Sequence, residues 1–354
     1  MSNLPHGVIA TYREFLPVTA DTPIVSLHEG RTPLIAARQL GKTFSPSISV
    51  YFKCEGFNPT GSFKDRGMCL AISKALEKKA RAVICASTGN TSASASAYGA
   101  RVGLPVCVVI PEGQIAMGKL AQAVIHGAKV LQIKGNFDVA LSIVKEIAVT
   151  QSLEIVNSIN PFRIEGQKTA AFEVCDVLGT VPTYHFLPVG NAGNITAYWK
   201  GYREYKEAKR ISALPKMMGF QAAGAAPIVL GRVVNNPETV ASAIRIGNPS
   251  SWKTAENVVA ESAGTIDMVT DDEILGAYTM LAEQEGIFCE PASAASVAGL
   301  LKMAHAGMFQ ANDTVVCTLT GHGLKDVDRA MAVTSRPTTC VSAEDVAEAI
   351  KRWL

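Results

Sequence analysis

Short apolar runs alternate with helical segments along most of this chain, and this rhythm restricts the fold more than any other feature. Seven runs have the length and content of buried strands: ISVYFKCE (48–55), AVICAS (82–87), VCVVIP (106–111), KVLQIKG (129–135), LEIVNSI (153–159), YHFLPVG (184–190) and TVVCTLTG (314–321). Helices are predicted between them, for example over 62–80 and 91–103. Strands that alternate with helices predict parallel sheets covered by helices on both faces, joined by right-handed crossovers.

The length of 354 residues favours two domains. The compact stretch 81–154 is predicted to form a smaller domain, inserted into a larger one made of 1–80 and 155–354. The predicted fold class is therefore α/β, with two doubly wound domains and mostly parallel sheets. The final segment VSAEDVAEAIKRWL (341–354) is predicted to form a docked helix whose apolar face carries Val346, Ile350 and Trp353.

Composition removes several classes of function. A net charge of +2 without a basic run argues against nucleic acid as a partner. No apolar run approaches the ~18 residues of a membrane span, and no leader pattern opens the chain. The eight cysteines are scattered without a C-x-x-C pair and the six histidines are isolated, so no metal site is expected. Cysteines inside apolar runs favour a reducing, cytoplasmic location.

Four loops that follow strands carry unusual residues, and ligands of such sheets bind beyond the carboxyl ends of the strands. The first is NPTGSFKDRG (58–67). Ser62 is predicted to cap the next helix, which places Lys64 in the first turn, where the helix dipole disfavours a cation. With Phe63 alongside, the pKa of Lys64 should be lowered, which favours a reactive amine. The alternative is a solvated lysine near Asp65 and Arg66.

The second loop is STGNTSASAS (87–96), which follows a strand and opens a helix. Free N–H groups at the helix start, with the hydroxyls of Thr88 and Thr91, can surround an anion such as a carboxylate. Asn90 adds both a donor and an acceptor. The alternative is an ordinary helix capped by serine and threonine.

The third and fourth loops are PVGNAGN (188–194) and LTGHGLKD (319–326). The glycines of the third allow successive N–H groups to converge on one phosphate monoester, although clusters of Gly and Asn are also common turns. In the fourth, Thr320 presents a hydroxyl at a strand end, unless the loop is an ordinary exit from a strand. A reactive lysine, a carboxylate cup, a phosphate nest and a hydroxyl are together what pyridoxal phosphate and an amino acid substrate require.

Six motifs carry a family resemblance: SFKDRG, STGNTSAS, PEGQIAMGKLAQA, NSINPFR, VGNAGN and EPASAAS. From about Thr32 to about Asp326 the chain resembles the threonine synthase family, which belongs to the pyridoxal-phosphate enzymes of the tryptophan-synthase-β type. The resemblance implies a cofactor in a cleft between the two domains, a homodimer, and conversion of O-phospho-L-homoserine and water to L-threonine and phosphate.

The resemblance also implies a role for each motif residue. Lys64 should carry the cofactor covalently and be the catalytic base. Asn90 should contact the ring oxygen of the cofactor, and Thr320 its pyridine nitrogen. Its phosphate should be held by Gly190, Asn191, Ala192, Gly193 and Asn194. The substrate carboxylate should be held by Ser87, Thr88, Asn90 and Thr91, and the substrate phosphate by Asn157, Ser158 and Arg163.

Two observations leave alternatives open. Gln114 stands where many relatives have lysine, so a related synthase that forms an amino-acid sulfonate is a second candidate. A serine/threonine dehydratase would use the same lysine without a second phosphate site, and a non-catalytic binding protein could keep the fold.

Arg163 begins a helix, where a cation is unfavourable unless it faces a phosphate. Its alternative role is a salt bridge with Glu165 or a place on the surface.

Overall fold

The computed structural model describes residues 7–44, 48–112, 117–135, 137–333 and 340–352. Within these ranges the strands form two sheets. The larger sheet has the order β1-β2-β10-β7-β8-β9, and the smaller has the order β5-β4-β3-β6. Every pairing is parallel except that of β1 with β2. The α/β fold with mostly parallel sheets is therefore confirmed.

The strand bounds are β1 Leu34–Ala36, β2 Ser49–Cys54, β3 Val83–Ala86, β4 Val106–Pro111, β5 Lys129–Ile133, β6 Glu154–Ile155, β7 Tyr184–Pro188, β8 Lys216–Ala222, β9 Thr265–Val269 and β10 Thr314–Leu319. Each of the seven apolar runs of the sequence contains one strand. β1, β8 and β9 lie outside those runs.

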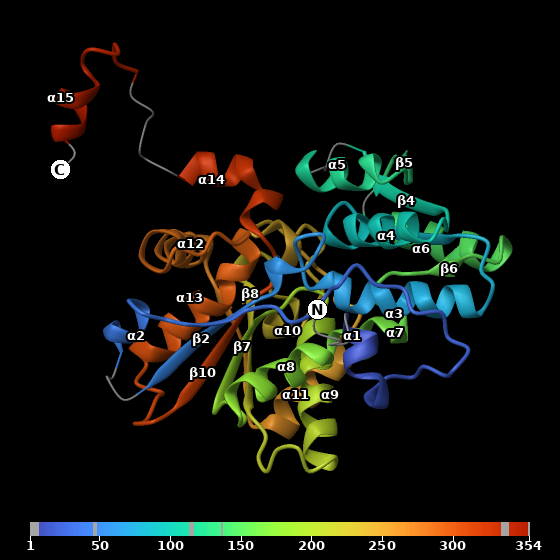
Figure 1. The fold of residues 1–354 in the computed structure, drawn as a ribbon, viewed down its shortest axis with the longest axis horizontal. Coiled ribbons are helices and arrows are strands. Elements are labelled where there is room, and N and C mark those ends of the chain that lie inside the picture. The colour runs from blue at the N-terminus through green and yellow to red at the C-terminus, as the bar shows by residue number, and fades with distance from the viewer. Residues whose placement is uncertain (1–6, 45–47, 113–116, 136, 334–339, 353–354) are drawn as a thin grey trace, which may run out of the picture.

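The helix bounds are α1 Val8–Thr11, α2 Leu40–Thr43, α3 Lys64–Glu77, α4 Asn90–Arg101, α5 Met117–Ile125, α6 Phe137–Thr150, α7 Pro161–Gln167, α8 Thr169–Leu178, α9 Gly193–Glu207, α10 Pro227–Leu230, α11 Trp252–Ser262, α12 Asp271–Glu285, α13 Pro291–His305, α14 Val327–Val333 and α15 Val346–Lys351. α4, α5 and α6 lie with the smaller sheet, and α3 and α7 lie between it and the larger sheet (Figure 1).

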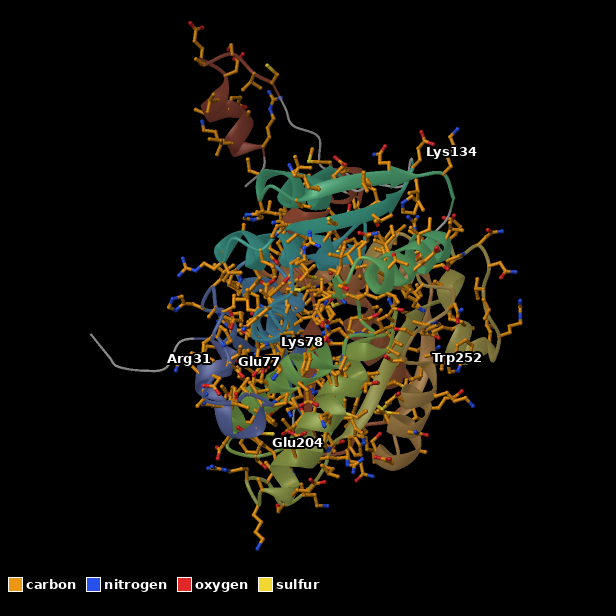
Figure 2. All side chains as sticks on the ribbon, turned by 90° about the vertical axis from the view of Figure 1, so that its right-hand side faces the viewer. Arg31, Glu77, Lys78, Lys134, Glu204 and Trp252 are labelled. Carbon is orange, nitrogen blue, oxygen red and sulfur yellow. The ribbon has the colours of Figure 1, made fainter. Side chains whose placement is uncertain are left out.

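Both faces of the larger sheet are buried. Neighbouring residues of β7 show this, since successive side chains of a strand point to opposite faces. In β7, Phe186 joins an apolar cluster with residues of α12 and α13. Its neighbour Leu187 joins a second cluster that includes residues of α8, α9 and α11. Lys134, after β5, and Glu204, on α9, lie on opposite sides of the main body in Figure 2. The second cluster also includes Val108 of β4, so strands of both sheets contribute to one apolar core.

The predicted docking of the C-terminal helix is wrong. α15 stands apart from the rest of the chain (Figure 1), and none of its described side chains is buried. Val346 and Ile350 are 43% and 45% exposed. Trp353, the third member of the expected apolar face, lies outside the described residues. Two aliphatic side chains on a helix of six residues offer little apolar surface to drive docking.

α3 and α7 cross at two glycines, so their backbones touch. A Cβ at Gly67 would lie 2.6 Å from the carbonyl oxygen of Arg163, and a Cβ at Gly166 would lie 2.0 Å from that of Arg66. Real Cβ atoms do not approach backbone this closely. The crossing therefore requires glycine at both positions, and it brings the start of α3 close to α7.

Gly166→Ala should separate the two helices. We expect the free energy of unfolding to fall by about 1–3 kcal/mol or more, as for other overpacked cores, measured by urea denaturation. Gly276→Ala, in the open interior of α12 with nothing within 4 Å of the added Cβ, is the matched control and should gain up to about 1 kcal/mol. Equal effects of the two substitutions would contradict the close crossing.

Candidate active site

The turn that carries Lys64 is joined to the turn that carries Thr320. The Phe63 N–H donates to the Thr320 carbonyl at 3.0 Å, and the His322 N–H donates to the Gly61 carbonyl at 2.9 Å. Ser62 and Gly321 form an antiparallel bridge between these bonds. Lys64 and Thr320 are far apart in sequence, and this small ladder places their backbones side by side.

The predicted N-cap role of Ser62 is wrong. Phe63 takes the N-cap position of α3 without a side-chain hydrogen bond, and the buried Ser62 hydroxyl has no partner in the described part of the chain. Asp65 stabilises the turn instead, since its carboxylate accepts the Thr60 N–H at 2.7 Å and the Thr60 hydroxyl at 2.6 Å. Asp65 also accepts the Ser94 hydroxyl at 2.6 Å, which ties α3 to α4.

Arg66 anchors α3 through a buried ion cluster. Its guanidinium donates to both carboxylate oxygens of Glu55, at 2.6 and 2.8 Å, and to both of Glu173, at 2.7 and 2.6 Å. Lys53 adds a second cation, 2.7 Å from Glu173. Burial works against the charge of Arg66, but the two carboxylates prevail and raise its pKa. Removing one partner from such a cluster typically costs about 3–5 kcal/mol.

The Lys64 amine is set up for chemistry. It is half-buried, and its Nζ lies 4.3 Å from the centroid of the Phe63 ring. The pKa of Lys64 is lowered to about 7, mainly by burial and next by the nearby charge of Arg163. Glu290 acts in the opposite direction. Asp65 and Arg66 are engaged with other partners, so the alternative of a lysine solvated beside them does not hold.

The loop after β3 leads into α4 as the sequence predicts, although α4 begins one residue earlier, at Asn90. The Ser87 hydroxyl oxygen accepts the N–H groups of Gly89 at 3.1 Å and Ser92 at 3.3 Å. Asn157 clamps the end of β3, since its side chain accepts the Ala86 N–H at 3.0 Å and donates to the Ala86 carbonyl at 2.8 Å. This amide thus positions the loop in which Ser87, Thr88 and Thr91 lie half-buried.

Asn90 meets a residue to which sequence analysis gave no role. Its Nδ2 donates to both carboxylate oxygens of Glu290, at 3.0 and 3.2 Å. Glu290 is 1% exposed and occupies the N-cap position of α13. The buried Oδ1 of Asn90 has no partner among described residues. The available signal for Glu290 was the motif EPASAAS, in which a carboxylate precedes the first proline of a helix.

The loop Gly190–Asn194 has the geometry of an anion nest. β7 ends at Pro188 and α9 begins at Gly193, with Ala192 in the left-handed region at φ 61°. The buried Nδ2 of Asn194 finds no partner in the described ranges. A left-handed residue directly before a helix N-terminus can converge N–H groups on an anion.

A second helix N-terminus reaches the same loop. The N–H of Ser250 donates to the Oδ1 of Asn191 at 3.2 Å, and the N–H of Ser251 donates to its backbone carbonyl at 3.2 Å. The Ser250 and Ser158 hydroxyls lie 3.0 Å apart. Sequence analysis missed the Ser250–Ser251 turn, because two serines before a helix also serve as ordinary caps.

Arg163 is a buried cation whose hydrogen-bond donors are only partly used. It is 1% exposed, and its Nη1 donates to the Val156 carbonyl at 2.8 Å. Nε and Nη2 have no partner within the described structure. Burial lowers the pKa of Arg163 to about 10, so it stays cationic at pH 7. The alternatives are both wrong, since Arg163 is not on the surface and Glu165 pairs with Lys168 at 2.5 Å and Lys200 at 3.3 Å.

Thr320 follows β10 at the same edge of the larger sheet as the nest. Its hydroxyl lies 3.1 Å from that of Ser293, the third residue of α13. The Gly321 N–H donates to the Ser293 hydroxyl at 3.0 Å. Ser293 thus orients the hydroxyl that the sequence singled out.

The unsatisfied groups of this region match what pyridoxal phosphate and its substrate offer. A carbonyl oxygen on Asn90, an N–H pair on Asn194 and two sets of donors on Arg163 are buried without described partners. Unpaired buried polar groups are costly, and a bound ligand removes that cost. The residues therefore fit a ligand that offers anionic groups to Asn194 and Arg163 and a donor to the Oδ1 of Asn90.

Other expectations fall partly outside the structure. Gln114 lies outside the described residues. In the described ranges, no cluster of three or more metal-binding side chains occurs, and no helix has the length and apolarity to cross a membrane.

Comparison with known proteins gives the family. Residues 25–321 match the family model described as "Pyridoxal-phosphate dependent enzyme". Threonine synthase of Halalkalibacterium halodurans is 60% identical over 326 residues, which cover 92% of this chain and 91% of that protein. Threonine synthase of Methanocaldococcus jannaschii is 51% identical over 335 residues, with coverage of 92% and 82%.

Solved structures support the fold. Threonine deaminase isoform 2 from Solanum lycopersicum has a TM-score of 0.74 at 21% identity, covering 95% of this chain and 97% of that one. Serine racemase from maize has a TM-score of 0.73 at 17% identity, with coverage of 94% and 95%. The chain belongs to the pyridoxal-phosphate dependent enzyme family and, within it, to the threonine synthase family.

Proposed function

We propose that this protein is a threonine synthase that converts O-phospho-L-homoserine and water to L-threonine and phosphate. The observation that carries the proposal is Arg163, a buried cation with unpaired donors that bears on the Lys64 amine. Arg163 belongs to α7, whereas the nest Gly190–Asn194 leads into α9, and we infer one anion for each. The names of the relatives support the same activity.

We assign the residues as follows. Lys64 binds pyridoxal phosphate covalently, Asn90 contacts its ring oxygen and Thr320 its pyridine nitrogen. The nest Gly190, Asn191, Ala192, Gly193 and Asn194 holds its phosphate. The first turn of α4, with Ser87, Thr88 and Thr91, holds the substrate carboxylate. Arg163 and Ser158 hold the substrate phosphate. Asn157 was expected to join them, but both ends of its amide are bonded to Ala86, so it positions the loop before α4 instead.

The chain's own groups then move protons and stabilise charge. When bound, pyridoxal phosphate supplies an electron sink for the substrate carbon atoms. The Lys64 amine removes a proton from Cα and then one from Cβ, since a pKa of about 7 leaves about half of the amine unprotonated at neutral pH. The Cγ–O bond breaks with its electron pair leaving on phosphate, whose charge faces Arg163. Lys64 returns one proton to Cγ, which becomes the methyl group, and the other to Cα. Water adds its hydroxyl at Cβ, and its remaining proton goes to the departed phosphate.

The location and assembly are parts of the same proposal. All eight cysteines are free thiols, and all except Cys107 and Cys340 are buried, which agrees with a reducing cytoplasm. A homodimer and two domains, 81–154 against 1–80 and 155–354, are expected from the family. Lys325 on the larger sheet's side donates to the Gln122 side chain on α5 at 2.6 Å, and this bond is one of the links across such a boundary.

A serine/threonine dehydratase is the second candidate, because it would use the same lysine and nest. It has no use for a second anion site at Arg163. Whether the protein discriminates phosphorylated from plain amino acids therefore separates the two functions.

The first test concerns cofactor and product together. Purified protein should carry pyridoxal phosphate on Lys64, located by borohydride reduction and peptide mapping, and should release threonine and phosphate in equal amounts from O-phosphohomoserine. Lys64→Ala should abolish product formation, because no other group replaces the amine. A label on another lysine, or 2-oxobutanoate without threonine, would overturn the assignment.

Arg163→Ala tests the substrate phosphate site. Loss of a hydrogen bond to a charged group costs about 1.5–3 kcal/mol, which corresponds to about ten- to a hundredfold in affinity for O-phosphohomoserine. Binding of serine and the cofactor content should stay unchanged. Arg203→Ala, which removes a half-exposed arginine paired with Glu261, is the control and should leave affinity unchanged. Equal weakening of serine and O-phosphohomoserine would place the phosphate site elsewhere.

A further inference from the structure

The carboxylate of Glu290 lies inside the candidate active site and is absent from the roles assigned above. Its backbone N–H donates to the Gly321 carbonyl at 2.9 Å, next to Thr320. A Cβ at Gly321 would come within 2.5 Å of its Oε1. The carboxylate is therefore pressed against the Thr320 turn on one side and bound to Asn90 on the other.

We propose that Glu290 is a positioning residue that fixes the orientation of the Asn90 amide toward the cofactor ring. The identity of the cofactor site rests on the proposed function. The contacts of Glu290 do not depend on which substrate is used.

The orientation of Asn90 follows from the donors and acceptors available. An ionised carboxylate only accepts hydrogen bonds, so Glu290 selects the Nδ2 end of the amide and excludes the flipped rotamer. The Nδ2 of Asn90 lies at similar distances from both Glu290 oxygens, 3.0 and 3.2 Å. One N–H shared between these oxygens leaves the second N–H for the ring oxygen. A glutamine at position 290 carries both a donor and an acceptor, so it would allow the Asn90 amide to turn either way.

The charge of Glu290 also opposes that of Arg163 at Lys64. From α7, Arg163 lowers the pKa of Lys64, and from the start of α13, Glu290 raises it. Asp65, the neighbour of Lys64 on α3, is engaged by Thr60 and Ser94.

Glu290 in addition joins the two sheets, since Asn90 opens α4 beside the smaller sheet and α13 packs on the larger one. The bond from Asn90 to Glu290 is thus a cross-link directly at the proposed cofactor. Its loss should loosen retention of the cofactor even where the nest is intact.

Glu290→Gln in the holoenzyme tests the inference, with Glu285→Gln as the matched control. Glu285 ends α12 and accepts the N–H groups of Arg38 and Gln39 at 3.0 Å, so its side chain faces another part of the chain. Two properties are measured: the circular dichroism band of the bound cofactor and the rate at which hydroxylamine removes it. Glu290→Gln should weaken the band and speed removal by about five- to tenfold, whereas Glu285→Gln should match the wild type.

A double-mutant cycle separates positioning from simple loss of stability. If Glu290 acts through Asn90, the double variant Asn90→Ala/Glu290→Gln should lose no more of the dichroism band than Asn90→Ala alone. Glu290→Asp, which keeps the charge but shortens the side chain, serves if the glutamine variant does not fold, and it should weaken the band as well. Additive losses, or variants that match the wild type in both measurements, would overturn the inference.

Failure of this inference can be told apart from failure of the proposed function. A wild-type protein without cofactor on Lys64 would end the proposed function itself. A wild-type protein that carries the cofactor and makes threonine, with a Glu290→Gln variant unchanged in band and removal rate, would end only the role given to Glu290.

Discussion

The placement of the reactive lysine depends on the ion cluster beneath it. Arg66 is locked by Glu55 and Glu173, and it lies two residues from Lys64 on the same helix. Burying these charges is tolerable only because every one is paired. The cluster joins the end of β2, α3 and α8 in a single network. The first turn of α3 is therefore fixed from below, and Lys64 needs no hydrogen-bond partner of its own to hold its position.

Much of the fold was predictable, because buried parallel strands produce continuous apolar runs. All seven runs contain a strand, but β1, β8 and β9 were not predicted. Within β8, Gly219 and Gln221 interrupt the apolar pattern, and Asp267 does so in β9. Gly219 is required because Val189 would lie 2.7 Å from an added Cβ. Such a residue reports a close tertiary contact, which local sequence does not reveal.

The candidate site was predictable to the extent that each residue lies in a loop after a strand or at the start of the next helix. Lys64, Asn90, the nest and Thr320 could be selected in this way. The lowered pKa of Lys64 comes from burial and from Arg163, which only tertiary structure brings near. Glu290 and Ser293 could not be selected, since their importance comes from contacts with Asn90 and Thr320 that only tertiary structure creates. The N-cap role of Ser62 was predicted wrongly because a serine before a helix is usually a cap, whereas here Asp65 stabilises the turn.

The crossing of α3 and α7 at Gly67 and Gly166 fixes the distance between the backbones of Lys64 and Arg163. Lys64 begins one helix and Arg163 lies on the other, and their backbones are already in contact. The backbone positions from which the amine and the guanidinium project are therefore fixed. This distance must match the length of the substrate's carbon chain, from the carbon that loses a proton to the phosphate that departs. Homologues that accept shorter or longer chains should differ in the backbone path of α7, more than in the identity of its arginine.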